Sequence, residues 1–342
     1  MRLTPLSAIL MLLLLAPSLA AQGAFPVLSP SPEVPEQEPA AQPSEAPAPP
    51  MRIALEAQWE ARASAYRGGT QARVSELEVR LRMTGRRGLA AFLAADLEAP
   101  LSPRPRGAVD EAYLDLGPGA SLWRLGRFRL PFGIYDRSEV DYSGFAEPAL
   151  VKSQGVIGAH LTRSGTGAQW IWAGAPWRLQ VSLANDDPPG GFSLRASGGA
   201  GTLRIERLLG PWLLGLDGYL GRARGPEFGG RASALGLDWR WATPWLQFRG
   251  EALLGGGAAG GERGIHADLW YHVPAIPDLT ALARLETARV GGASRSRATL
   301  GARYRLRRGP DVTLAVNLLQ ELSRAEGTPF RAEMQLLVSH RL

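Results

Sequence analysis

Cysteine is absent from the 342 residues of this sequence, and lysine occurs once, at Lys152. Without cysteine the chain cannot form a disulfide framework, carry a lipid on a cysteine or build a thiolate metal site. Because lysine is so rare, the positive charge of the chain rests almost wholly on arginine. Arginine stays ionised in confined sites and binds anionic groups through paired N–H donors.

Enzyme motifs are also absent. Ser164 and the other serines lack the Gly-x-Ser-x-Gly setting of an esterase, and the glycine-rich run 255–261 lacks the Lys-Ser/Thr of a phosphate loop. His266, Asp268 and His272 share one face of a predicted strand, but residues two and four apart on a strand lie about 7 and 14 Å apart. That spacing allows only partial chelation. We therefore expect no enzyme, no metal and no cofactor.

The N-terminal region divides into two segments. Residues 1–20 place Arg2 before a short apolar run and end in small residues, as a secretory signal peptide does. A transmembrane helix is the alternative, but the run is short and no basic cluster follows it. Residues 21–50 carry a proline every few positions and only acidic charges, which predicts an unfolded periplasmic tether.

Residues 51–342 are predicted to be the folded part. They contain 37 Lys+Arg against 28 Asp+Glu, a formal charge of +9. Apolar and polar residues alternate here: Leu55, Ala57 and Trp59 are interleaved with Glu56, Gln58 and Glu60. This is the period of a strand with one apolar and one polar face, whereas a helix would scatter the charges around its axis.

The alternation continues to the end of the chain and predicts an all-β fold. Connections after even-numbered strands are short and those after odd-numbered strands are mostly longer, which is typical of a closed antiparallel transmembrane β-barrel with periplasmic termini. A soluble β-sandwich would leave strand edges to protect, and an open sheet in lipid would leave backbone groups unpaired. Sixteen strands are predicted, near 52–66, 71–84, 88–98, 109–117, 121–130, 155–164, 168–184, 200–209, 211–222, 231–242, 244–254, 263–273, 277–290, 295–308, 310–323 and 330–341.

One of these segments has two interpretations. Residues 168–184 form either one long strand bent at Pro176 or two strands joined by a turn at Gly174 to Pro176. The single strand preserves the alternation of short and long connections in this strand assignment, so it is the interpretation we prefer.

The segment 131–154 is the third long connection and has no period. A barrel of about sixteen strands is wide enough for water, so an inward-folded loop would narrow it to a constriction. The alternatives are an external flap with solvated acids and, for the wall arginines, an interior ion-pair network. The predicted constriction residues are Asp136, Arg137, Glu139, Asp141, Glu147 and Lys152. The predicted pore-wall residues are Arg80, Arg82, Arg297, Arg303, Arg305 and Arg307.

Tryptophan and tyrosine cluster near the predicted strand ends, beside turns. Aromatic girdles at the two membrane interfaces would place them there, although some could face a partner subunit. The residues concerned are Trp59, Trp123, Trp177, Trp212, Trp239, Trp241, Trp245 and Tyr271.

The stretch "LGRFRLPFG" (125–133), the long loop and "GVIGAHL" (155–161) resemble Gram-negative outer-membrane porins, most of all the phosphate-selective porin family and related anion-preferring porins. The specific likeness is confined to the surroundings of that loop. It implies a sixteen-stranded barrel, a homotrimer and a constriction formed by the loop. The chain ends in Leu342, whereas barrels of this class commonly end in an aromatic residue that their assembly machinery recognises.

Taken together, these features predict a passive, water-filled channel for small hydrophilic solutes in the outer membrane, leaning to anions because of the +9 charge. The alternative is a non-channel barrel, either a structural or adhesive surface protein or an outer-membrane enzyme. The expected partners are outer-membrane lipid and lipopolysaccharide, small polar or anionic solutes, the barrel assembly machinery and two further copies of the chain, but no nucleic acid.

Overall fold

The computed structural model describes residues 51–66, 69–85, 88–98, 106–117, 119–134, 144–145, 147–153, 164–185, 199–223, 230–257, 260–290, 292–306, 311–322 and 331–341. The predicted signal peptide (1–20) and tether (21–50) lie outside these residues. The regular structure is almost entirely β. Its elements are β1 Arg52–Tyr66, β2 Gly69–Thr84, β3 Leu89–Glu98, β4 Arg106–Leu116, β5 Ser121–Arg129, α3 Leu150–Ser153, β6 Ser164–Gly174, β7 Trp177–Asn185, β8 Gly199–Leu209, β9 Trp212–Ala223, β10 Gly230–Ala242, β11 Leu246–Gly257, β12 Gly260–His272, β13 Leu279–Val290, β14 Ala293–Leu306, β15 Asp311–Glu321 and β16 Arg331–Arg341.

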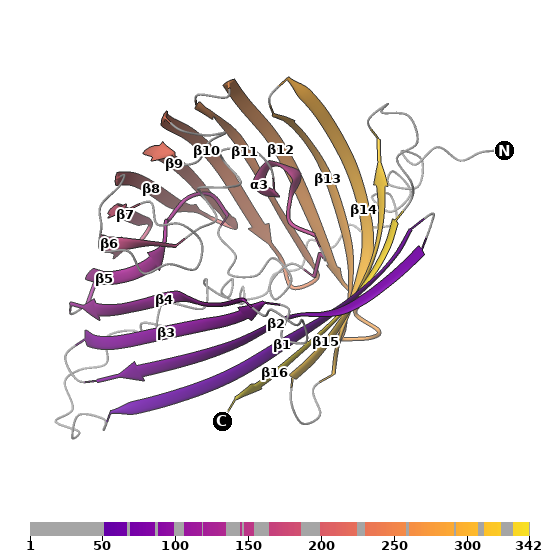
Figure 1. Ribbon diagram of the computed structural model, residues 1–342, viewed down its shortest axis with the longest axis horizontal. Helices are drawn as coiled ribbons and strands as arrows, with labels where there is room; N and C mark the ends of the chain where they lie inside the picture. Colours follow the sequence, from indigo (N-terminus) through magenta and orange to yellow (C-terminus); the bar gives the residue numbers. More distant parts are fainter. Residues whose placement is uncertain are drawn as a thin grey trace.

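The strands form one closed antiparallel barrel (Figure 1). Every strand pairs with its neighbours in the chain, and β1 pairs with β16 from Glu56 opposite Arg341 to Tyr66 opposite Arg331. Closure gives the backbone groups of the first and last strands a partner and leaves no free edge. The predicted closed antiparallel barrel of sixteen strands is confirmed for the described residues.

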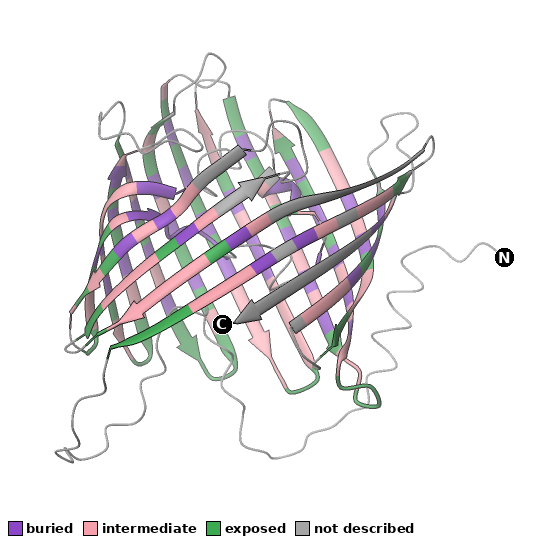
Figure 2. Cartoon of the chain, turned by 60° about the horizontal axis from the view of Figure 1, so that its bottom comes forward, coloured by how far each residue is buried: buried purple, intermediate pink, exposed green. Residues whose placement is uncertain are grey.

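The barrel is apolar outside and polar inside. On β10, Leu235 and Leu237 are 63% and 49% exposed, whereas the next residue, Asp238, points inward and is fully buried. Figure 2 shows the same alternation of buried and exposed residues along the neighbouring strands. The predicted in-and-out pattern is confirmed on β10 and β12, and on β14 from Arg297 to Leu300. Within the described residues, no α-helix is both long and apolar enough to cross a bilayer.

Exposed aromatic side chains gather at one end of the barrel. Trp123, Trp177, Trp212, Trp245 and Tyr271 are 36–54% exposed, and each lies beside one of the short turns that follow even-numbered strands. Amphipathic rings favour the boundary between apolar and aqueous surroundings. These five positions agree with the predicted girdle at the short-turn end, whereas Trp239 and Trp241 are half-buried. The side chain of Trp59 lies outside the described set.

The prediction of one strand over 168–184 is wrong. β6 ends at Gly174, and β7 begins at Trp177 opposite it, so Ala175 and Pro176 form a tight turn. Proline has no N–H to donate to a sheet and readily occupies a turn, which explains the break. The separate strand predicted over 155–164 overlaps a described strand only at Ser164. Residues 155–163 of that predicted strand lie outside the described residues. Short turns still follow the even-numbered strands.

Candidate functional site

The connection after β5 folds into the interior of the barrel, called the lumen below. Its described parts are residues 130–134, 144–145 and 147–153. Leu130, Phe132 and Leu150 are at most 3% exposed and pack with buried side chains of the inner wall. The short helix α3 contacts β12, β13 and β14 from inside, within the ring of strands in Figure 1. The predicted inward fold is confirmed for these described parts of the loop.

Glu251 of β11 anchors the beginning of the loop. Its side chain is fully buried, and its Oε1 accepts a hydrogen bond of 3.2 Å from the backbone N–H of Ile134. Its Oε2 lies 3.1 Å from the Nζ of Lys152, which also donates to the carbonyl of Ile134. A buried carboxylate is costly unless it is paired and hydrogen-bonded. The two parts of the loop therefore supply the donors that make this carboxylate tolerable.

Gly133 makes this close approach possible. Its φ is +70°, and a Cβ there would lie 1.7 Å from Oε1 of Glu251. We expect Gly133→Ala to lower the free energy of unfolding by about 1–3 kcal/mol, because it adds backbone strain and displaces the loop from β11. Urea unfolding, monitored by the heat-dependent gel mobility of the folded barrel, measures this loss.

Gly119 supplies the matched control for that variant. Its φ is +68°, but a Cβ there would meet nothing within 4 Å. Gly119→Ala should therefore show the strain alone and lose about 1 kcal/mol or less. Equal losses in the two variants would contradict a steric role for Gly133 at Glu251.

A second anchor holds the end of the loop against β13 and β14. The backbone N–H of Leu150 donates to Oε2 of Glu286 at 2.5 Å. Arg297 donates to Oε1 of Glu286 at 2.6 Å, to Oε2 of Glu147 at 2.9 Å and to the carbonyl of Pro148 at 2.7 Å. One guanidinium thus joins the wall to both a side chain and the backbone of the loop.

Arg284 of β13 makes the third anchor. Its Nε and Nη2 lie 2.7 and 2.9 Å from the two carboxylate oxygens of Asp268. Its Nη1 donates to the carbonyl of Glu147 at 3.0 Å, and its guanidinium stacks 4.2 Å from the ring centre of Phe145. Phe145 in turn packs edge-on against Trp270. Strands β11, β13 and β14 supply these three anchors, so the described parts of the loop lie against one side of the lumen.

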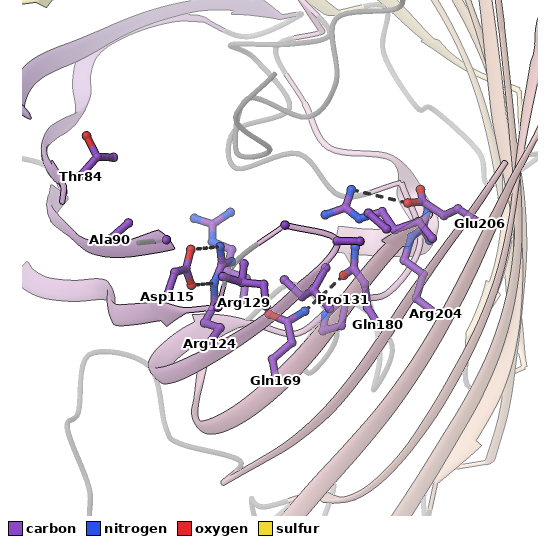
Figure 3. Close-up of a pocket in the computed structure, with 18 of the residues that line it drawn as sticks. Thr84, Ala90, Asp115, Arg124, Arg129, Pro131, Gln169, Gln180, Arg204 and Glu206 are labelled. Atoms are coloured by element: carbon purple, nitrogen blue, oxygen red, sulfur yellow. Dashed lines mark hydrogen bonds and ion pairs between the residues drawn. The ribbon is translucent and has the colours of Figure 1, made fainter. Parts of the chain in front are cut away.

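An open cavity of about 470 Å³ lies beside the base of the loop (Figure 3). Its lining includes glycines of two short turns, Gly85 and Gly117, which places it toward the short-turn end. Six arginines and two carboxylates line it, a formal excess of four positive charges. These charged residues are Arg82, Arg124, Arg129, Arg178, Arg204, Arg240, Asp115 and Glu206.

Carboxylates of adjacent strands hold several of these arginines in place. Arg124 grips Asp115, its cross-strand neighbour, through two hydrogen bonds of 2.8 and 3.0 Å. Arg178 and Arg240 each lie 3.6 Å from one or the other oxygen of Glu206. The guanidinium groups are thus oriented by neighbouring carboxylates. Further carboxylates that pair with lining arginines do not line the cavity themselves: Asp110 and Glu111 beside Arg129, and Asp217 and Asp238 beside Arg204.

A β-bulge positions Arg129. Ala94 of β3 lies opposite Glu111 of β4 and Ala95 opposite Val109, so Asp110 has no partner residue of its own. A bulge redirects side chains that would otherwise alternate. Asp110 accepts a 2.8 Å hydrogen bond from Nε of Arg129, whose Nε also lies 3.8 Å from Glu111.

The predicted site residues fall into three groups: described residues of the loop, described arginines of the wall, and residues outside the described set. Glu147 and Lys152 lie in the lumen, but in direct contact with wall residues. Of the predicted wall arginines, Arg297 binds the loop, and Arg82 lines the cavity. Arg80 pairs with Glu78 of its own strand, Arg303 lies beside Gly144, and Arg305 is exposed. Five predicted residues lie outside the described residues: Asp136, Arg137, Glu139, Asp141 and Arg307. The cavity arginines that the sequence pattern did not single out are Arg124, Arg129, Arg178, Arg204 and Arg240.

No protein-family model and no curated protein matches this chain. Solved structures do match it. OmpF of Salmonella typhi, in complex with daunomycin, has a TM-score of 0.63 at 11% identity, over 84% of this chain and 97% of that chain. The in-vitro-folded trimer form of OmpT, an outer-membrane protein of Vibrio cholerae, has a TM-score of 0.62 at 11% identity, over 85% and 100%. OccK2 of Pseudomonas aeruginosa, in complex with glucuronate, has a TM-score of 0.51 at 15% identity, over 85% and 98%. At these identities the likeness is one of fold: the chain has the barrel of outer-membrane porins.

Proposed function

We propose that this chain is an outer-membrane porin, a passive water-filled channel for small hydrophilic solutes with a preference for anions. The apolar outer surface suits a bilayer, and the docked loop narrows a lumen that sixteen strands would otherwise leave wide. The observation that carries the anion preference is the cavity beside the loop, where six arginines face two carboxylates.

Charge acts strongly in such a gap because low-dielectric walls focus the field of the lining groups. Guanidinium groups in this lining raise the local concentration of anions and lower that of cations. The proposed activity is diffusion along a concentration gradient, so it uses no catalytic step and no cofactor. We also propose a homotrimer in the outer membrane, supported by the trimer form of the structurally similar OmpT.

Single-channel recording in planar bilayers tests the channel. Folded, purified protein should give discrete conductance steps, and a salt gradient should give a reversal potential on the anion side. A reversal potential on the cation side would overturn the anion preference. No steps at all would overturn the channel and favour a structural barrel whose lumen is closed by the loop.

Neutralising cavity arginines should weaken the preference without unfolding the barrel. Arg82 and Arg178 are only partly buried, and Arg82 makes no ion pair with any described residue. Arg82→Gln and Arg178→Gln should each lower the anion-to-cation permeability ratio by about twofold or more, because each removes one charge from the narrow path.

Arg207→Gln is the matched control. Arg207 is exposed on the outer face of β8, over the ring of Trp177. Its neutralisation changes the net charge by the same amount but leaves the cavity untouched, so the permeability ratio should not change. Equal shifts for Arg82→Gln and Arg207→Gln would show that the cavity does not set selectivity.

A further inference from the structure

Four exposed arginines stand on the outer face of the barrel, at the end opposite the short turns. They are called the rim arginines below: Arg222 of β9, Arg231 of β10, Arg263 of β12 and Arg289 of β13. Each lies an even number of residues from an exposed apolar side chain of its own strand, so it shares that outward face. These apolar residues are Leu220, Leu235, Ile265 and Leu285, 45–72% exposed.

The rim arginines form two like-charged pairs. Arg222 lies directly opposite Arg231, and Arg263 lies directly opposite Arg289. Residues in such positions have Cβ atoms about 5 Å apart, and like charges there repel each other. An anion between the two guanidinium groups would turn this repulsion into paired charge-assisted hydrogen bonds.

No described carboxylate compensates these pairs. The acidic residues in β9 to β13 are at most 7% exposed and belong to the buried, inward-facing set. Among the described residues, none forms an ion pair with a rim arginine. The acidic residues concerned are Asp217, Asp238, Glu251, Glu262, Asp268 and Glu286.

The rim arginines lie just beyond the apolar band. Arg222 follows the exposed Leu220 by two residues, and Arg263 precedes the exposed Ile265 by two. Next to Arg289, the outer face is polar: Thr287 accepts a hydrogen bond from Ser296, its cross-strand neighbour on β14. The opposite ends of these strands carry the aromatic girdle instead. The two edges of the band therefore differ in chemistry, with aromatic rings at one and exposed arginines at the other.

Lipid phosphates lie at this level, where the hydrocarbon core gives way to headgroups. In barrels with short periplasmic turns, the loop end faces the outer leaflet. We propose that each pair of rim arginines binds a phosphate group of an anionic lipid in the outer leaflet. Arginine suits this role because its planar, always-charged fork matches phosphate geometry. The inference goes beyond channel function, since the rim arginines face away from the lumen.

Two double variants and their combination test the proposal on the folded full-length chain: Arg222→Gln with Arg231→Gln, Arg263→Gln with Arg289→Gln, and all four together. The probe is purified lipopolysaccharide, intact or enzymatically dephosphorylated, titrated in a zwitterionic detergent. Each double variant should bind the intact lipid at least about tenfold more weakly than the native protein does. The quadruple variant should bind the intact lipid no more tightly than the native protein binds the dephosphorylated lipid.

Arg207→Gln is again the matched control, because it removes an exposed outward arginine from the opposite end. It should leave lipid affinity unchanged. Undiminished binding of intact lipid by both double variants, or equal binding of intact and dephosphorylated lipid by native protein, would overturn the proposal. If the quadruple variant does not fold, the two double variants decide. Conductance should be unchanged in every folded variant, so a failed lipid test and a failed channel test are distinguishable.

Discussion

Replacing Arg204 by methionine is expected to lower the free energy of unfolding by about 3–5 kcal/mol. The guanidinium lies 2.6 Å from Asp217, 2.8 Å from Asp238 and 2.8 Å from Glu206. The carboxylates of Asp217 and Asp238 are completely buried, and Arg204 itself is 3% exposed. Methionine fills similar space but leaves three clustered carboxylates without their shared cation. Urea unfolding in detergent, followed by the migration of the folded barrel, measures the loss.

Arg178→Met is the matched control for this variant. Arg178 lies on the inner face of the neighbouring strand β7. Its side chain is 26% exposed, and its described carboxylate neighbour, Glu206, is 3.6 Å away. Because the two groups are 3.6 Å apart and Glu206 keeps its closer partner Arg204, we expect this partly buried pair to contribute about 1 kcal/mol or less. Adding Asp217→Asn and Asp238→Asn to Arg204→Met should recover most of the loss, because it removes two of the uncompensated charges. Equal losses for Arg178→Met and Arg204→Met would contradict the shared-cation role.

The barrel could be predicted from the sequence because successive side chains of a strand point to opposite faces of the sheet. Asp238 points inward and Leu237 outward for a reason visible in the chain itself: period-two alternation. Local turn chemistry was harder to interpret. Pro176 is compatible with both a bent strand and a tight turn, and only the pairing of Gly174 with Trp177 decides between them.

The sequence allowed us to predict that the loop folds inward, but not which contacts hold it there. Charge counting favours loop acids facing wall arginines, and Glu147 with Arg297 follows that polarity. At Glu251 and Glu286 the polarity is reversed, since wall carboxylates accept hydrogen bonds from backbone N–H groups of the loop. Every residue except proline carries such a donor, so no sequence pattern marks the ones that are used.

The arginine-lined cavity required strand register, which alternation does not supply. Arg124, Arg178, Arg204 and Arg240 come from four different strands and meet only because the pairing places them at one level. The predicted wall arginines were taken from the polar faces of the strands predicted near 71–84 and 295–308, and of these Arg82 lines the cavity and Arg297 binds the loop. A search for inward arginines opposite inward carboxylates would have found Arg124 with Asp115, had the register been known.

Replacing Arg297 by methionine is expected to release the end of the loop and raise single-channel conductance. The guanidinium is the described group that joins Glu286 of the wall to both Glu147 and the carbonyl of Pro148. Without it, the carboxylate of Glu286, whose side chain is 1% exposed, keeps the hydrogen bond from the N–H of Leu150. We expect a loss of about 3–5 kcal/mol in the free energy of unfolding, because one buried charge is left uncompensated. Arg207→Met is the control: it removes an exposed arginine from the outer face of β8 and should change neither quantity.

A second variant separates release of the loop from general destabilisation. Arg297→Met combined with Glu286→Gln removes both charges of the buried pair, so most of the stability should return. The contacts of Arg297 with Glu147 and Pro148 are still missing, so conductance should stay high. If conductance instead returns to the native value together with stability, Arg297 serves the wall alone and the loop is held by its other anchors, Glu251 and Arg284.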